Sequence, residues 1–314
     1  MTIIASFTSS TRLIDIMRDH FLTLQHFERY TEMLHKLIIK NYGKIPLPIF
    51  YKQFKADSIL KISKLVFEMF HASYSKGEPV SKLKDYFEYF LQSYEIARKE
   101  YAELKIEFPE LNNEQRGDRF FFQWKCFMRY KKALQMLGFA ICLDIPDEQW
   151  KRLINIIYTN PFKNSVAQKD ALLDRIVAFR EPNWEISNHL YYPQVYKPLL
   201  QLFTTKEEER SLMLYQFVNS WYDNCYKVME KSAGEYGFYN RNPENLTEHI
   251  YYGFWCVEAV LMAKILNIDD HLCWGHQDYP GDLIRKDDEP STHPIVNEPQ
   301  EKISLMQKFK KIFI

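Results

Sequence analysis

The stretch FWCVEAVLMAKILNI, residues 254–268, is the part of this sequence that decides the fold. Its apolar residues surround a helix axis instead of forming one stripe, and Glu258 and Lys264 are its only charged residues. A helix of this kind has no face suited to water, so it is buried among other helices. We therefore expect a central apolar helix from about residue 246 to residue 268.

Amphipathic helices are predicted on the N-terminal side of this stretch. Apolar residues recur every three, four or seven positions along 13–38, 50–75, 83–108 and 114–143, which is the period of a helix with one buried face. No segment alternates as a half-buried strand does. Only 9 of 314 residues are Gly, too few for the turns and phosphate loops of a large β or dinucleotide-binding protein. The fold class is therefore all-α, a helical array in two packed halves.

A stretch with two prolines and few periodic residues, 180–193, separates the halves. We expect an N-terminal domain of long helices over 1–180 and a C-terminal domain over 181–285, which contains the central apolar helix. Residues 286–314 form a Pro-rich acidic linker and a short basic amphipathic helix.

The charge is uneven along the chain, although Lys plus Arg and Asp plus Glu are both 41. Residues 1–180 carry a net charge of +7, residues 181–300 carry −10 and residues 301–314 carry +3. A region of one sign attracts an oppositely charged partner and speeds its association. The same charges would also serve simply to keep a surface solvated.

The sequence predicts a cytoplasmic protein without a membrane span. Residues 1–12 lack the basic and apolar regions of a secretory signal. The longest apolar run, near 136–143, is far shorter than the roughly 18 residues that cross a bilayer. Five Cys residues without a CxxC motif are typical of free thiols in a reducing compartment.

Two groups of residues keep an enzyme as an alternative interpretation. His271, Cys273 and His276 could ligate Zn²⁺ in a metal-dependent hydrolase, but their spacing is not that of a standard zinc site and no second ligand pair follows. Glu258 could act as a general acid or base. A buried carboxylate more often ties helices together by accepting from a Trp, Tyr or Arg. We therefore expect no metal, no cofactor and no catalytic residue.

A nucleic-acid-binding module is a further alternative. Residues 116–132 combine Arg and Lys with aromatic side chains, which can contact phosphates and stack on bases. No signature of a known nucleic-acid module accompanies them. A solvated helix face is the simpler interpretation, so no direct contact with nucleic acid is expected.

Motif residues in the second half of the chain resemble a known family. They are Tyr191–Pro193, Tyr196, Leu199, Leu200, Trp221, Tyr222, Tyr251–Trp255, Glu258, Ala259, Ile268–Asp270 and Tyr279–Leu283. In this order and spacing they are similar to the PoNi immunity proteins, which protect bacteria from PoNe-type polymorphic DNase toxins. The resemblance is strongest over 191–285, and a weaker one covers roughly 12–180.

The resemblance implies an all-α cytoplasmic protein without catalytic activity that binds a cognate DNase toxin and blocks it. Together with the acidic charge, it suggests that an acidic surface covers the basic DNA-binding face of the toxin. The candidate contact residues are Asp269, Asp270, Trp274, Asp278, Tyr279, Asp282, Asp287, Asp288 and Glu289, to which Glu207–Glu209 are added. Trp221, Trp255 and Glu258 are expected to stabilise the fold.

Overall fold

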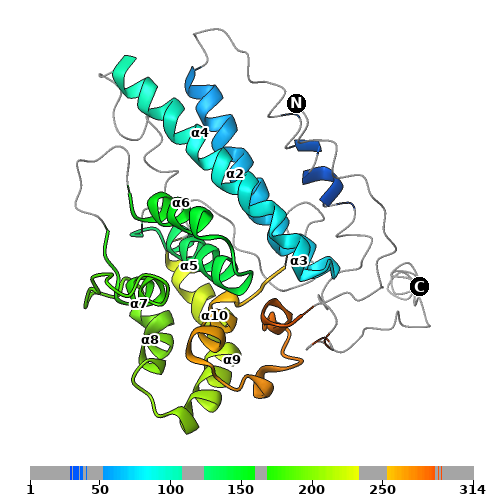
Figure 1. Cartoon of the computed structure of the whole chain (residues 1–314), viewed down its shortest axis with the longest axis vertical. Helices are drawn as coiled ribbons and strands as arrows, with labels where there is room; N and C mark the ends of the chain where they lie inside the picture. Colours follow the sequence, from blue (N-terminus) through cyan, green and yellow to red (C-terminus); the bar gives the residue numbers. More distant parts are fainter. Residues whose placement is uncertain are drawn as a thin grey trace, which may run out of the picture.

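Two long antiparallel helices form one end of the molecule (Figure 1). The computed structural model describes residues 52–107, 124–159, 168–232 and 253–286, together with 29, 31–34, 36–37, 40, 289 and 291. α2 (Lys52–Lys76) and α4 (Asp85–Glu107) pack side by side and are joined by the short α3 (Val80–Leu83). Gly77, at φ 90°, ends α2 in a conformation that other residues rarely adopt.

The middle of the molecule consists of α5 (Phe127–Cys142) and α6 (Asp147–Tyr158). An uninterrupted run from Ala133 to Cys142 is buried in α5, so this helix has almost no free face. α6 lies against α4, where the guanidinium of Arg152 pairs with Glu88 at 2.9 Å and Glu95 at 2.7 Å.

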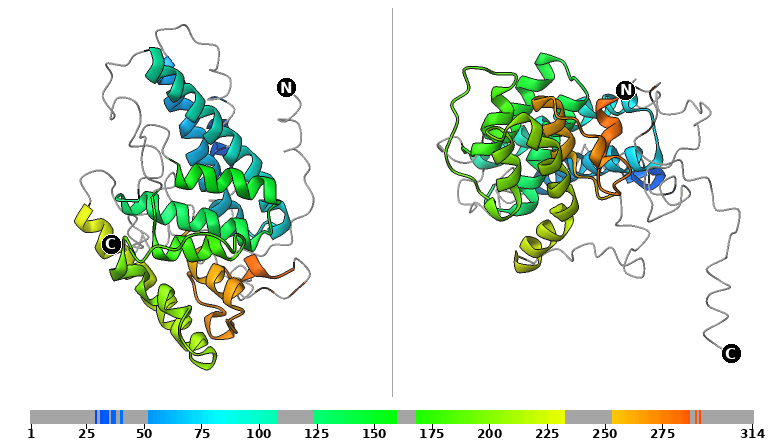
Figure 2. Two further views of the ribbon diagram at one scale, coloured as in Figure 1. Left: turned by 60° about the vertical axis from the view of Figure 1, so that its left-hand side comes forward. Right: turned by 90° about the horizontal axis from the view of Figure 1, so that it is seen from below.

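α7 (Ala171–Ala178), α8 (Pro193–Leu202) and α9 (Glu207–Ser232) form the other end, away from α2 and α4 (Figure 2). The buried Asp170 caps α7 and accepts from the amides of Leu172 and Leu173 at 2.9 and 3.0 Å. Pro193 begins α8, a position where its missing N–H is not needed.

α10 (Val257–Leu266) packs mainly against α5 and has seven consecutive buried residues, Val257–Ala263. The expected start of this helix near residue 246 is wrong for residues 253–256, which are not helical. Gly253 has a φ of 107°, and a Cβ there would lie 2.3 Å from Ser75 Oγ. The amide of Cys256 donates to the carbonyl of Asp278 at 2.7 Å instead of continuing a helix backwards.

Side chains from the two halves of the chain are packed into each other. The indole of Trp255 donates to Ser75 Oγ of α2 at 2.8 Å, and Gln135 of α5 donates to the carbonyl of Trp255 at 3.1 Å. The backbone of α5 and α10 approaches closely at Gly138, where an added Cβ would lie 2.7 Å from Val257 Cγ1. The segment 253–257 therefore fastens the C-terminal half onto α2 and α5.

The all-α fold class is confirmed, since the described part of the chain contains helices and no strand. The helix expected over 114–143 is not continuous, because residues 124–126 form a turn and α5 begins at Phe127; residues 114–123 lie outside the described residues. Within the described ranges, no helix has both the length and the apolar character needed to cross a membrane. Most of the first expected helix and all of the C-terminal segment from 292 lie outside the described residues.

Candidate protein-binding surface

The irregular segment after α10 carries most of the candidate contact residues. Asn267, in the left-handed conformation with φ 49°, ends α10. The chain then forms two short 3₁₀ turns, η5 (His271–Cys273) and η6 (Gly281–Ile284). Cys273, Tyr279 and Leu283 are buried and hold this segment against the helices.

Asp270 is the centre of a buried polar cluster within this segment. Its carboxylate pairs with the Arg285 guanidinium at 2.7 Å and accepts from the Tyr279 hydroxyl at 2.6 Å. The Trp274 indole also donates to it at 2.9 Å. Burial and the adjacent carboxylate raise the pKa of Tyr279, so its hydroxyl stays protonated and remains a donor. The cluster fixes the path of the backbone between α10 and η6.

The structure divides the candidate contact residues into buried and exposed groups. Asp270, Asp278, Tyr279 and Asp282 are buried. Asp282 accepts from the Ser291 hydroxyl at 2.7 Å, so its carboxylate already serves the fold. Asp269, Trp274 and Glu289 are exposed. Asp287 and Asp288 lie outside the described residues. Among the described candidates, only the exposed group can meet a partner without rearrangement of this segment.

Trp274 is exposed but held in place. Its side chain is 52 % exposed, yet its ring lies 4.5 Å from the Arg285 guanidinium and its N–H is bonded to Asp270. Next to it Leu272 is 40 % exposed. Leu272 could not be recognised from the sequence as a candidate contact residue, because a single Leu in a polar, irregular segment carries no periodic signal.

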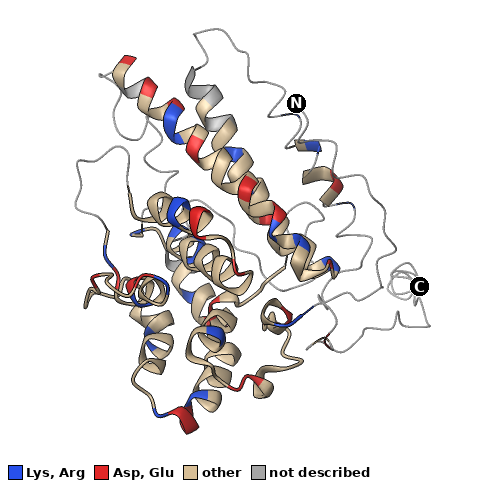
Figure 3. Ribbon diagram, viewed as in Figure 1, with Lys and Arg blue, Asp and Glu red and all other residues tan. Residues whose placement is uncertain are grey.

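The N-terminus of α9 lies against the η5 segment. The hydroxyl of Ser211 donates to the backbone carbonyl of Asp269, which joins the two elements. Glu207, Glu208 and Glu209 are exposed in the first turn of α9 and place carboxylates at this end of the molecule (Figure 3). Leu212, one residue after Ser211, is 53 % exposed and was also missed from the sequence, because it lies off the buried stripe of α9.

The proposed metal ligands do not converge. No cluster of three His, Cys, Asp or Glu side chains suited to a metal ion occurs among the described residues, which include this whole segment. His271 Nδ1 lies 2.8 Å from Asp269 Oδ1, and His276 Nδ1 accepts from the amide of Asp278. Burial raises the pKa of the Cys273 thiol to about 12, which disfavours the thiolate that binds zinc. The hydrolase alternative therefore has no geometric support here.

The basic segment before and within α5 does not form an open phosphate-binding face where it is described. Lys131 lies over the ring of Trp221 at 4.7 Å, and Lys132 lies over Phe67 at the same distance. Both lysines are partly buried between helices. Residues 116 and 119 lie outside the described residues.

The three expected fold determinants are buried. Glu258 accepts from the Tyr196 hydroxyl at 3.2 Å, which links α10 to α8. Burial raises the pKa of this carboxyl, and the nearby Lys131 opposes the increase. Trp221 packs beneath Lys131, and Trp255 bonds Ser75.

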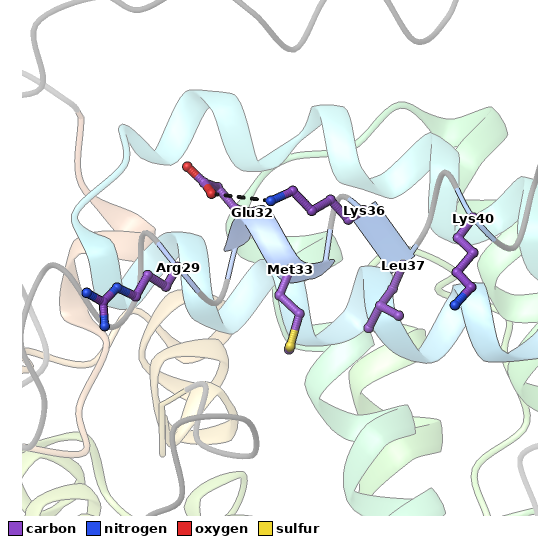
Figure 4. Close-up of a pocket in the computed structure, with 6 residues that line it drawn as sticks. All are labelled: Arg29, Glu32, Met33, Lys36, Leu37 and Lys40. Atoms are coloured by element: carbon purple, nitrogen blue, oxygen red, sulfur yellow. Dashed lines mark ion pairs between the residues drawn. The ribbon is translucent and has the colours of Figure 1, made fainter.

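A shallow groove elsewhere is lined by Arg29, Glu32, Met33, Lys36, Leu37 and Lys40 (Figure 4). These side chains form no catalytic arrangement.

Two family models match most of the chain. The model described as PoNe immunity protein (PoNi), N-terminal, matches residues 18–155, and the model described as PoNe immunity proteins (PoNi), C-terminal, matches residues 168–283. The chain belongs to the PoNi family of immunity proteins. The PoNi resemblance inferred from the motif residues is thus confirmed. The C-terminal PoNi model covers α7 to the start of η6, and with them Asp270, Trp274, Tyr279 and the N-terminus of α9, and it ends just before Arg285.

Comparison with solved structures gives the fold alone. A structure titled "The Crystal Structure of Protein PA2201 from Pseudomonas aeruginosa" matches with a TM-score of 0.65 at 15% sequence identity. The match covers 87% of this PoNi chain and 91% of that chain. No curated protein matches the sequence significantly.

Proposed function

We propose that this PoNi protein neutralises a cognate PoNe-type DNase toxin by forming a stoichiometric complex with it. The match of both family models, over 18–155 and 168–283, carries this proposal. In this proposal the protein acts in the cytoplasm of the cell that makes it, or of its kin. It catalyses no reaction and does not itself bind nucleic acid.

The net charge of −10 over residues 181–300 supports an electrostatic contribution to binding. A DNase needs a basic surface to hold phosphates, and carboxylates of an inhibitor can occupy the positions that those phosphates would take. Among the described candidate residues, the exposed carboxylates of α9 and of the η5 segment are able to act in this way. The buried Asp270, Asp278 and Asp282 contribute through the fold instead.

Co-expression in a sensitive bacterium tests the proposal. The toxin domain encoded beside this gene is expressed with and without the protein, and the two are then co-purified. We expect restored growth and a complex of fixed stoichiometry. A nuclease assay with purified components should show loss of DNA cleavage at equimolar protein. Undiminished toxicity with no complex would contradict the proposal.

A further inference from the structure

Three exposed apolar side chains lie on α9 and the η5 segment, two elements that contact each other. Large hydrophobic side chains that are exposed in the described residues are Ile96, Ile106, Phe179, Ile186, Leu212, Leu272 and Trp274. The last three lie on the two elements that the Ser211–Asp269 hydrogen bond joins. Exposed apolar residues on adjoining elements with charged residues around them are typical of a protein-binding site.

Trp274 has the properties of an anchor residue. It is among the residue types that dominate binding energy at protein interfaces. The Asp270 carboxylate and the Arg285 guanidinium already fix its ring in the free protein. Since the ring is ordered before binding, Trp274 loses little side-chain entropy when a partner covers it.

The charges around this cluster favour a basic partner. Glu207, Glu208 and Glu209 are exposed at the start of α9, and Asp269 is exposed beside η5. The pKa of Asp269 is held below its usual value by the hydrogen bond from His271, so this carboxylate is ionised at neutral pH. Lys206 and Arg210 offset part of this charge, and the balance of these side chains remains negative.

We propose that Leu212, Leu272 and Trp274, with the carboxylates of Glu208 and Asp269, form the surface that docks onto the toxin. The occupant is a Lys- and Arg-rich protein surface with an apolar centre, that is, the DNA-binding face of the DNase. This inference rests on the proposed function and deepens it by naming the contact surface. The apolar side chains hold the complex together, and the carboxylates direct the encounter.

Surface variants of the full-length protein test the apolar part of this surface. Binding is measured by surface plasmon resonance against the immobilised toxin domain encoded beside the gene, in a catalytically inactive form. Trp274→Ala and Leu272→Lys should each weaken the affinity at least tenfold, mainly through faster dissociation. Phe179→Ala is the matched control, because Phe179 is 51 % exposed and follows α7, an element that carries none of the proposed contact residues. It should leave the affinity unchanged.

The double variant Glu208→Gln/Asp269→Asn tests the role of charge. It should slow association and flatten its dependence on salt, while the dissociation rate stays close to that of the unmodified protein. Urea unfolding of every variant shows whether its fold is intact. Leu272→Lys changes only an exposed side chain outside the Asp270 cluster, so it remains informative even if Trp274→Ala loosens the segment.

The outcomes separate this inference from the function on which it rests. If the unmodified protein binds the toxin and folded Trp274 and Leu272 variants bind equally well, the docking surface is wrong and the immunity role stands. If the unmodified protein does not bind the toxin at all, the proposed function fails and the docking surface fails with it. Weakened binding in both variants but not in Phe179→Ala supports the surface.

Discussion

Glu258 is a buried carboxylate at the contact between α10 and α8. It accepts from Tyr196 at 3.2 Å and is fully shielded from water. Glu258→Ala should lower the free energy of unfolding by about 1–3 kcal/mol, because it leaves the Tyr196 hydroxyl buried without this acceptor. Glu258→Gln keeps an acceptor and should cost less. Urea unfolding at pH 7 measures both, and an equal loss in the two variants would contradict the structural role.

Lys132 places its ammonium among aromatic rings between α2, α4 and α5. It lies 4.7 Å from the ring of Phe67, 5.7 Å from Phe90 and 6.0 Å from Tyr94. Burial lowers its pKa from 10.5 to about 7, while Glu68 opposes the change. The folded protein therefore binds fewer protons at this site than the unfolded chain between these two pH values.

This pKa shift predicts a pH-dependent effect of Lys132→Met. The contribution of Lys132 to stability should rise as the pH increases from about 7 towards 10.5, because in that range the unfolded chain still binds the proton that the folded protein has released. Lys132→Met removes the titrating group, so its advantage over the unmodified protein should be largest near pH 7 and shrink by pH 10. Urea midpoints of both proteins across this range measure the difference, and parallel profiles would refute the prediction.

At the scale of elements, the crossing of α5 and α10 depends on Gly138. An added Cβ would lie 2.7 Å from Val257 Cγ1, on a stiff β-branched side chain, and 3.4 Å from the carbonyl of Val257. Gly138→Ala gains about 1 kcal/mol of helix propensity. Overpacking at the crossing costs about 1–3 kcal/mol. We therefore expect a net loss of stability.

A double-mutant cycle with Val257→Ala tests whether this loss comes from the contact. Val257→Ala removes the Cγ1 atom that the new methyl group would meet. In that background, Gly138→Ala should cost less than in the unmodified protein, giving a coupling of about 0.5 kcal/mol or more. Denaturant unfolding of the four proteins measures it. Additive effects would show that the crossing relaxes elsewhere.

At the scale of the whole molecule, the two halves share one packed interior. Trp255 bonds Ser75 across 180 positions of sequence, and α10 is buried against α5. A fragment of residues 161–314 would expose both Trp255 and the α5-facing side of α10. We expect it to lack near-UV circular dichroism and to bind a hydrophobic dye. The full chain should unfold in one transition, and a separate, cooperatively folded C-terminal fragment would contradict this prediction.

The periodic segments and the family motif were predictable because their signals are local. An apolar stripe reports the buried face of a helix whatever it packs against, so long helices such as α2, α4 and α5 were recognised. The absence of helix at residues 253–256 was not predictable, because the apolar residues of this stretch would fit a helix equally well. Gly253 has a φ of 107° there, and the amide of Cys256 bonds the carbonyl of Asp278, a non-local contact that no local pattern encodes.

Exposure within the candidate surface could not be predicted from the sequence. Asp269 and Asp270 are adjacent and identical in type, yet one is exposed and the other is buried with Arg285. An irregular segment has no period from which to infer which side chains face inwards. The partners that decide this burial, Tyr279 and Arg285, approach through the tertiary fold.

The sequence by itself determined the helical class, the uneven charge and membership of the PoNi family, since composition, periodicity and motif order are properties of the chain alone. Only the tertiary structure decided which motif residues stabilise the fold and which reach the surface. It also placed Leu212 of α9 beside the Leu272–Trp274 segment, about 60 positions later in the chain. The physical reason is that burial in an irregular segment depends on non-local contacts, which no local pattern encodes.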